Sequence, residues 1–97
     1  MKAIFITFDQ AHYDNVVTIL ERNGARGFTS WNEVQGRGSK KGEPHYGSHA
    51  WPSLNGSIMT VVEDDRVNVL LEKLKALDLE KEALGLRAFV LPVEQAI

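Results

Sequence analysis

The chain has 97 residues, of which 43% are hydrophobic and 25% charged, with a formal net charge of -2 and no cysteine. This length suffices for one compact domain and is too short for two, so we expect a single domain over residues 1–97. The missing cysteines exclude disulfides, thiolate metal sites and cysteine nucleophiles, and the net charge argues against general nucleic-acid binding. No apolar run reaches the roughly 20 residues of a spanning helix, and the N-terminus lacks a signal-peptide pattern, so we expect a cytoplasmic protein without membrane insertion.

The first third of the chain predicts a strand, a helix and a second strand. Residues 2–8 are β-branched and aromatic with apolar character on both faces, which is typical of a buried central strand. Asp9 can cap a helix over residues 10–23, and the Asn-Gly pair that follows can end it. Residues 28–34 are rich in β-formers and predict a strand, although polar residues interrupt the run. The helix has one apolar stripe, formed by Tyr13, Val16, Val17 and Leu20.

The second half of the chain repeats this order. Residues 57–63 predict a strand, and Asp64 or Asp65 can cap the helix that follows. Leu-Gly at positions 84 and 85 ends this helix or a short continuation of it, and residues 86–93 predict the last strand. The apolar stripe of the second helix consists of Val67, Leu70, Leu71, Leu74 and Leu77.

The element order βαββαβ predicts an α+β fold. Two right-handed strand-helix-strand units pack most simply as a four-stranded antiparallel sheet with both helices on one face, the ferredoxin-like plait. Each helix has a single apolar stripe, yet the central strands are apolar on both faces, so the helix-free face needs another cover. We therefore predict a homo-oligomer, preferably a trimer, that buries this face around a central axis.

The segment of residues 35–52 loses all periodicity and predicts a long loop between the second and third strands. Loops of this length inside a compact domain are usually functional or mobile. Its glycines permit close approach of a ligand, and Arg37, Lys40 and Lys41 supply cationic donors that suit phosphate or carboxylate. The Gly-Arg-Gly run matches neither a Walker motif nor a dinucleotide fingerprint, so a small anionic ligand and a flexible hairpin tip remain alternatives.

Three histidines are candidate metal ligands. His45 and His49 lie four residues apart and follow Glu43, so two imidazoles and a carboxylate could meet at zinc or copper. Because no helix fixes their spacing, the alternative is a pair of surface histidines with ordinary hydrogen bonds. For His12, near the start of the first helix, we predict a partly exposed position, and it could act as a third ligand only where subunits meet.

Three aromatic residues lie in or next to the loop: Trp31, Tyr46 and Trp51. We expect them to anchor the base of the loop, and stacking on a ligand or packing on a neighbouring subunit are the alternatives. The loop contains no evident nucleophile-base pair, so an enzyme is the lesser hypothesis.

The element order, the length and the start of the loop together resemble the PII signalling family. The run from Glu33 to Gly38, Glu-Val-Gln-Gly-Arg-Gly, is followed by Lys-Lys-Gly, and in that family a Val-x-Gly-x-Gly run followed by a basic residue and Gly opens the T-loop. The T-loop contacts regulated transporters and enzymes and responds to bound effectors. The resemblance thus implies a homotrimer with ligand sites in clefts between subunits. The residues it assigns as candidate effector contacts are Gly36, Arg37, Gly38 and Lys40.

The chain also departs from the family pattern. The family's second glycine-rich loop, Thr-Gly-x-x-Gly-Asp-Gly-Lys, has no counterpart after the third strand, where residues 62–66 lead straight into a helix. The basic pair near the chain end is absent as well, and only Arg87 is available there. The resemblance is therefore to a divergent, compact PII-like protein without the standard nucleotide loop. This resemblance implies regulation of membrane transport, including that of metal ions, and the CutA family, which shares the trimeric plait, is the neighbouring alternative.

Three functions follow from these observations. The first is a non-enzymatic regulatory trimer whose T-loop-like segment, residues 35–52, binds a small anionic effector or a divalent metal and docks on a partner such as a membrane transporter. The second is a CutA-like metal-binding protein that uses Glu43, His45 and His49. The third is a small oligomeric ferredoxin-like enzyme with a cleft between subunits, since fold alone does not decide function.

Overall fold

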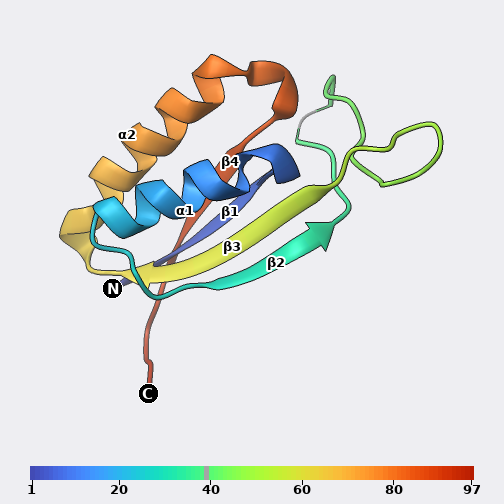
Figure 1. The fold of residues 1–97 in the computed structure, drawn as a ribbon. Helices are drawn as coiled ribbons and strands as arrows, with labels where there is room; N and C mark the ends of the chain where they lie inside the picture. The colour runs from blue at the N-terminus through green and yellow to red at the C-terminus, as the bar shows by residue number, and fades with distance from the viewer. Residues whose placement is uncertain (39) are drawn as a thin grey trace.

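The computed structural model describes residues 1–38 and 40–97 and contains one antiparallel sheet with strand order β2-β3-β1-β4. Figure 1 shows α1 and α2 lying together on one face of this sheet. This arrangement confirms the predicted α+β ferredoxin-like plait. The elements in chain order are β1 (Lys2–Asp9), a 3₁₀ turn η1 (Gln10–His12), α1 (Tyr13–Arg22), β2 (Thr29–Val34), β3 (Asn55–Val62), α2 (Asp64–Glu80), a 3₁₀ turn η2 (Glu82–Leu84) and β4 (Arg87–Pro92).

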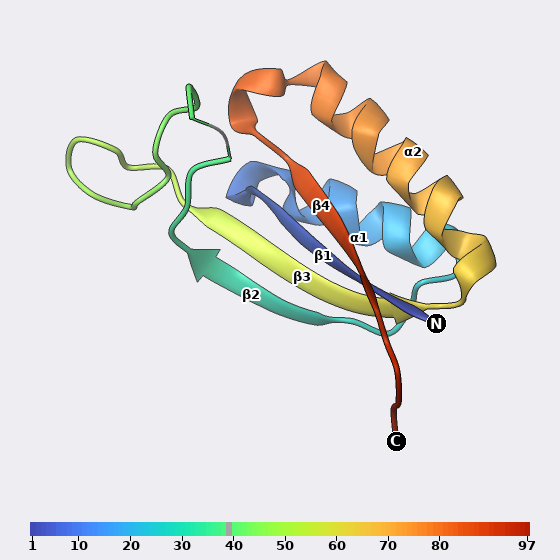
Figure 2. The same cartoon turned by 180° about the vertical axis from the view of Figure 1, so that it is seen from behind.

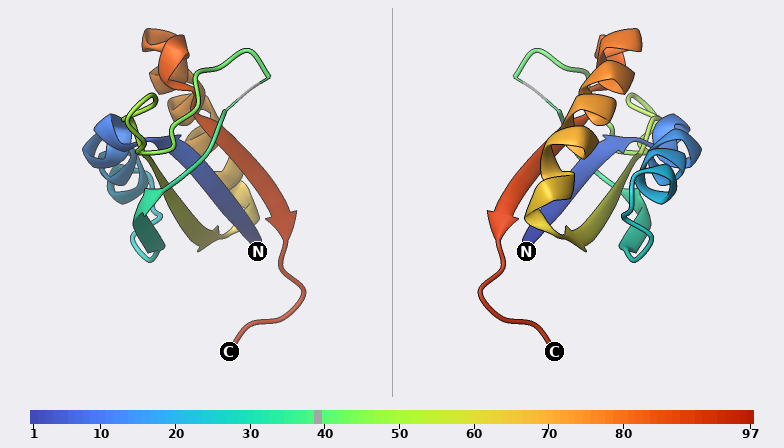
Figure 3. Two further views of the ribbon diagram at one scale, coloured as in Figure 1. Left: turned by 90° about the vertical axis from the view of Figure 1, so that its right-hand side faces the viewer. Right: turned by 90° about the vertical axis from the view of Figure 1, so that its left-hand side faces the viewer.

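The core lies between the helices and the central strand. β1 pairs with β3 on one side and β4 on the other, and alternate side chains of β1 point to the helices. Ile4, Ile6 and Phe8 are fully buried there. As Figure 3 shows, the two helices form one layer against the sheet, so one apolar stripe per helix is enough to close the core. The stripes contribute the buried residues Val16, Leu20, Leu70, Leu74 and Leu77.

The opposite side of the sheet, which we call the open face, carries exposed apolar side chains. Phe5 of β1 is the Cα partner of Met59 on β3 and of Phe89 on β4, so these three residues form a row across the sheet. Met59 is 36% exposed and Phe89 is 54% exposed. Trp31 of β2 and Leu91 of β4 extend this apolar surface. The sequence-based expectation of an apolar face without helix cover is therefore confirmed.

The start of α1 differs from the prediction. The first three residues of the expected helix form the turn η1, and the α-helix begins at Tyr13. Asp9 acts as the predicted cap, because its Oδ1 accepts a hydrogen bond from the backbone N–H of Ala11 at 2.8 Å. A 3₁₀ turn has fewer residues per turn than an α-helix, so it changes the direction of the side chains it carries.

The prediction that Asp64 or Asp65 caps α2 is wrong. The N-cap residue is Glu63, which makes no side-chain capping bond, and Asp64 is the first helical residue. The Asp64 carboxylate instead accepts a hydrogen bond from the N-terminal amino group of Met1 at 2.9 Å. That bond and the positive charge of the amino group lower the pKa of Asp64 below its ordinary value of 3.8. The amino group of Met1, just before β1, thus pairs with the carboxylate that the sequence pattern assigns to the helix cap.

The long loop leaves the end of the sheet that is opposite to both chain termini, as Figures 1 and 2 show.

The predicted stops are confirmed: Gly24 follows α1 and Gly85 follows η2, the short continuation of α2, and both adopt positive φ, at 82° and 71°. In the part of the chain that the structure describes, no helix is long and apolar enough to cross a membrane.

Candidate functional site

Two isolated β-bridges organise the loop. Gly36 pairs with His45, and Tyr46 pairs with Leu54. The first bridge has two backbone hydrogen bonds, from Gly36 N to His45 O at 3.0 Å and from His45 N to Gly36 O at 2.7 Å. We call residues 40–44 the flap and residues 46–54 the arm. The loop is thus divided at His45 into two parts.

The arm is a short hairpin held by its own hydrogen bonds. Gly47 N donates to Ser53 O at 2.9 Å, and Ser48 N donates to Trp51 O at 2.8 Å. Its base is fixed to the body by the bond from Gln10 N to Leu54 O at 3.0 Å. A second tie runs from the Gln35 side chain to the carbonyl of Tyr46 at 2.7 Å.

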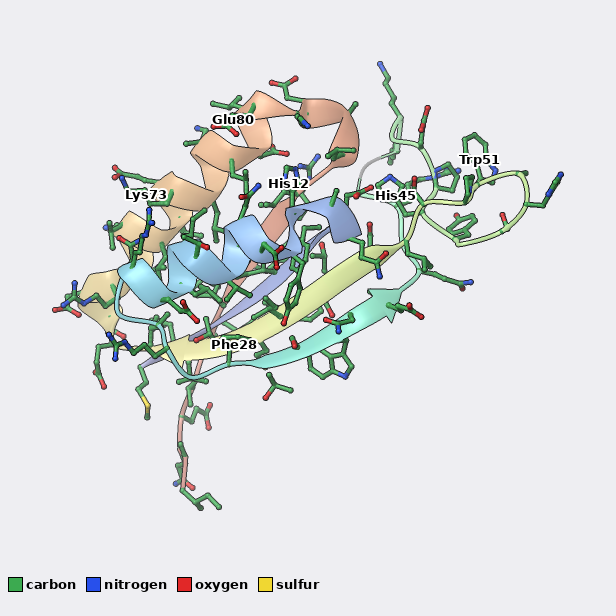
Figure 4. The ribbon with its side chains drawn as sticks, viewed as in Figure 1. His12, Phe28, His45, Trp51, Lys73 and Glu80 are labelled. Atoms are coloured by element: carbon green, nitrogen blue, oxygen red, sulfur yellow. The ribbon has the colours of Figure 1, made fainter. Side chains whose placement is uncertain are left out.

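The aromatic residues do not anchor the base of the loop, so that prediction is wrong. Tyr46 and Trp51 are 39% and 41% exposed, and Trp31 lies exposed on the open face. The buried position at the base is occupied by His45 instead, and Figure 4 shows His45 where the loop meets the sheet, with Trp51 further out on the arm.

His45 is 4% exposed and is held by polar partners from two strands. Its Nδ1 lies 2.6 Å from Oδ1 of Asn55 at the start of β3, and 3.7 Å from Oδ2 of Asp9 at the end of β1. With the amide oxygen as acceptor, Nδ1 carries the proton. Asp9 and Asn55 are Cα partners in the β1–β3 ladder, so the sheet itself sets the spacing of these two groups. The surface-histidine alternative is therefore wrong for His45.

His12 is also buried, with 4% exposure, and its Nε2 has no hydrogen-bond partner among the described residues. The prediction of a partly exposed position is wrong, because the 3₁₀ turn replaces the first helical turn on which that prediction depended.

The structure does not bring the three candidate metal ligands together as a preformed site. Glu43 and His49 are exposed, whereas His45 is buried with its Nδ1 bonded to Asn55. Across residues 1–38 and 40–97, no group of three His, Asp or Glu side chains is close enough to hold a metal ion. Metal binding by Glu43, His45 and His49 stays a prediction.

A cleft of about 260 Å³, which we call the loop cleft, separates the flap from the turn between α2 and β4. At one end, Gly38 and Gly85 pack backbone against backbone: a β-carbon on Gly38 would lie 3.0 Å from the Gly85 carbonyl oxygen. Two cations and two carboxylates line the cleft. Its lining consists of Gly38, Lys41, Gly42, Glu43 and His45 from the loop and Glu82, Ala83, Leu84, Gly85 and Arg87 from the other wall.

A second cleft of about 290 Å³, the sheet cleft, lies on the loop end of the open face. It combines an aromatic ring, hydroxyl groups, an amide and the glycine backbone. A β-carbon on Gly36 would lie 2.7 Å from Nδ2 of Asn55, so a larger residue here would require the Asn55 side chain to shift. The lining consists of Phe5, Thr7, Val34, Gln35, Gly36, Arg37, Gly38, Asn55 and Ser57.

Three of the four predicted effector contacts lie in these clefts. Gly36, Arg37 and Gly38 line the sheet cleft, and Gly38 also lines the loop cleft, so this residue is common to both clefts. Lys40 is exposed on the flap and lines neither of them among the described residues, where Lys41 takes its place.

Sequence reasoning missed the residues of the opposite wall. The sequence marks Arg87 only as a remaining basic residue and assigns no role to Glu82, nor to Asn55 of the sheet cleft. The Leu-Gly pair before β4 is the sequence feature that could have indicated this wall, because a glycine of positive φ there turns the chain back toward the loop.

Comparisons with known proteins agree with this fold. The chain matches the family described as Nitrogen regulatory protein P-II over residues 1–97. It is similar to the structure of CPII, a nitrogen regulatory PII-like protein from Thiomonas intermedia K12 bound to ADP, AMP and bicarbonate, with 25% identity, a TM-score of 0.73, and coverage of 92% of this chain and 81% of that chain.

Two further similar structures show the same fold. One is CPII bound to ADP, AMP and acetate, with 22% identity, a TM-score of 0.72 and coverage of 99% and 88%. The other is a putative PII-like signaling protein from Thermus thermophilus, with 21% identity, a TM-score of 0.65 and coverage of 92% and 82%. No curated protein matches the chain. On the match over its full length, the chain belongs to the nitrogen regulatory protein P-II family.

Proposed function

We propose that this protein is a non-enzymatic PII-like regulator that binds an adenine nucleotide or a related small anion across its two clefts. The observation that carries this proposal is the position of Gly38, which lines both clefts, so that a ligand lying across this residue would contact both. At the same residue the loop touches the turn before β4.

The two clefts have complementary chemistry. In the sheet cleft, the ring of Phe5 and the hydroxyl groups of Thr7 and Ser57 suit a base and a sugar. In the loop cleft, Lys41 and Arg87 supply the cationic donors that suit phosphate or carboxylate. The ADP, AMP, bicarbonate and acetate named for the similar CPII structures belong to these chemical classes.

We propose a homotrimer as the working form. The sheet cleft lies at the end of the open face, and Phe5 belongs both to that cleft and to the exposed apolar row of this face. A second copy that covers the open face would therefore also supply a wall of the ligand site. Under this proposal, a single chain forms only part of the ligand site, and a neighbouring copy supplies the remaining wall.

The arm is the proposed docking element. It holds Tyr46 and Trp51 exposed on a hydrogen-bonded hairpin, and aromatic side chains of this kind dominate the energetics of protein interfaces. The partner class that the family resemblance implies is a membrane transporter.

The test is calorimetry with ADP, AMP and bicarbonate on the full chain. We expect ADP to bind, and Arg87→Gln and Lys41→Gln each to weaken binding by about tenfold, or 1.4 kcal/mol, because each removes one charge-assisted contact. The matched control is Lys73→Gln, which neutralises an exposed lysine on α2, far from the loop in Figure 4. A chain that binds none of the three probes, or that loses affinity equally in the control, contradicts the proposal.

A further inference from the structure

The loop cleft contains opposite charges that do not pair with one another. Lys41 and Glu43 come from the flap, and Glu82 and Arg87 come from the opposite wall. Among the described residues, the ion pair of Arg87 is with Asp78, at 3.8 Å, and the other three side chains of this set form none. The cleft thus offers a ligand both hydrogen-bond donors and hydrogen-bond acceptors.

His45 adds an acceptor to this cleft, because the sheet fixes the position of its proton. Nδ1 faces two oxygen atoms, Oδ1 of Asn55 at 2.6 Å and Oδ2 of Asp9 at 3.7 Å. An amide oxygen and a carboxylate can only accept, so the proton of the neutral ring is on Nδ1. Nε2 of the same ring then keeps its lone pair and can only accept a hydrogen bond.

Nε2 lies on the edge of the ring that is turned away from Asn55 and Asp9. The His45 side chain is more than nine-tenths buried, and the residue lines the loop cleft. Within residues 1–38 and 40–97, the hydrogen bond of this side chain is the one made by Nδ1. A buried acceptor is disfavoured without a donor partner, so a ligand that brings a donor into the cleft gains this contact.

We propose that His45 is a specificity-determining residue that selects oxyanions carrying a hydroxyl group, such as hydrogen phosphate, over fully ionised oxyanions of the same shape and charge. The inference rests on the proposed function, since it names the class of anion that the loop cleft takes. Lys41 and Arg87 attract both kinds of anion, whereas Nε2 of His45 accepts a hydrogen bond only from a protonated oxygen. The carboxylates of Glu43 and Glu82 repel a fully ionised anion further, and such repulsive contacts are a source of specificity.

The test is calorimetry of the full chain with sodium phosphate and with sodium sulfate at the same ionic strength. At about pH 8, above the range in which histidine side chains usually take up a proton, both probes are tetrahedral dianions and only phosphate keeps a hydroxyl group. We expect the Kd for phosphate to be lower than that for sulfate by at least about tenfold, because sulfate leaves Nε2 without a donor. Equal affinity for the two probes, or absence of phosphate binding, overturns the inference.

Two amide substitutions separate the roles of the two ring nitrogens. His45→Asn places an N–H near the position of Nδ1 and no atom at that of Nε2, so we expect the fold to be kept and the two Kd values to become similar. His45→Gln places its amide group near the position of Nε2 and should keep part of the preference for phosphate. A preference that His45→Asn retains in full overturns the role of His45.

Arg87→Gln is the control for charge. It removes a donor that serves both anions, so it should weaken phosphate and sulfate by a similar factor and leave their ratio unchanged.

A second pair of probes covers the case in which thermal melts show that His45→Asn does not fold. Bicarbonate and nitrate are planar monoanions, and only bicarbonate carries a hydroxyl group. The unchanged chain should bind bicarbonate more tightly, and equal affinity for this pair overturns the inference. ADP binding without selectivity between the probes leaves the proposed function standing, whereas a chain that binds none of ADP, AMP and bicarbonate contradicts the proposed function itself.

Discussion

Gly38 and Gly85 are in backbone contact although they lie far apart in the sequence, with little space for a side chain at the α-carbon of Gly38. A methyl group at Gly38 would lie 3.0 Å from the Gly85 carbonyl oxygen, so the loop and the turn before β4 would have to separate slightly. This contact joins the wall that carries Arg87 to the wall that carries Lys41, so the geometry of the candidate site depends on it.

Gly38→Ala tests this dependence. We expect the variant to lose about 1–3 kcal/mol of stability, the usual effect of overpacking, and to bind ADP more weakly, as measured by chemical unfolding and calorimetry. Gly27→Ala is the control, because a β-carbon there has nothing within 4 Å. Equal ADP affinity for the two variants would show that the contact does not shape the site.

Phe89→Asp tests the proposed trimer. A carboxylate at the β4 end of the apolar row on the open face should prevent burial of this row against another copy, so we expect light scattering to report a smaller assembly than for the unchanged chain. The control is Leu79→Asp, on α2, which is 59% exposed and does not belong to the open face. A wild-type chain that is monomeric at all concentrations would refute the trimer itself.

Asp64 predicts a pH dependence of stability with a defined sign. Its pKa is lowered in the folded chain by the hydrogen bond and the charge of the Met1 amino group. The ionised pair therefore stabilises the fold above the ordinary pKa of 3.8, and this contribution is lost as pH falls through the lower folded value.

We expect Asp64→Asn to lower the melting temperature slightly at neutral pH, and the difference from the unchanged chain to shrink in acid below about pH 4. Thermal melts across this range measure it. In an N-terminally acetylated chain, which lacks the amino charge, the substitution should have little effect at any pH. A difference that persists in the acetylated chain would assign the effect to another cause.

The candidate metal set of Glu43, His45 and His49 has its own test. If these residues bind zinc or copper, calorimetry should detect binding that the double variant His45→Ala/His49→Ala loses. Because Nδ1 of His45 is bonded to Asn55, metal would have to approach through Nε2 or displace that bond. Binding that is unchanged in the double variant excludes this set.

The sequence by itself determined the elements and the sheet. The β-branched and aromatic run of β1, apolar on both faces, and the single stripes of α1 and α2 depend on near neighbours along the chain, which is why the plait and its apolar open face could be predicted. The predicted Gly36, Arg37 and Gly38 also lie in a cleft. These features follow from residues that are near neighbours in the sequence.

Only the tertiary structure decided which distant residues share a site. Burial of His45 depends on Asp9 and Asn55, which are brought side by side by the β1–β3 register, and no spacing in the loop contains that information. The pairing of Asp64 with the Met1 amino group is also long-range, because the two residues are 63 positions apart. Long-range pairing, rather than local preference, therefore set the chemistry of the loop.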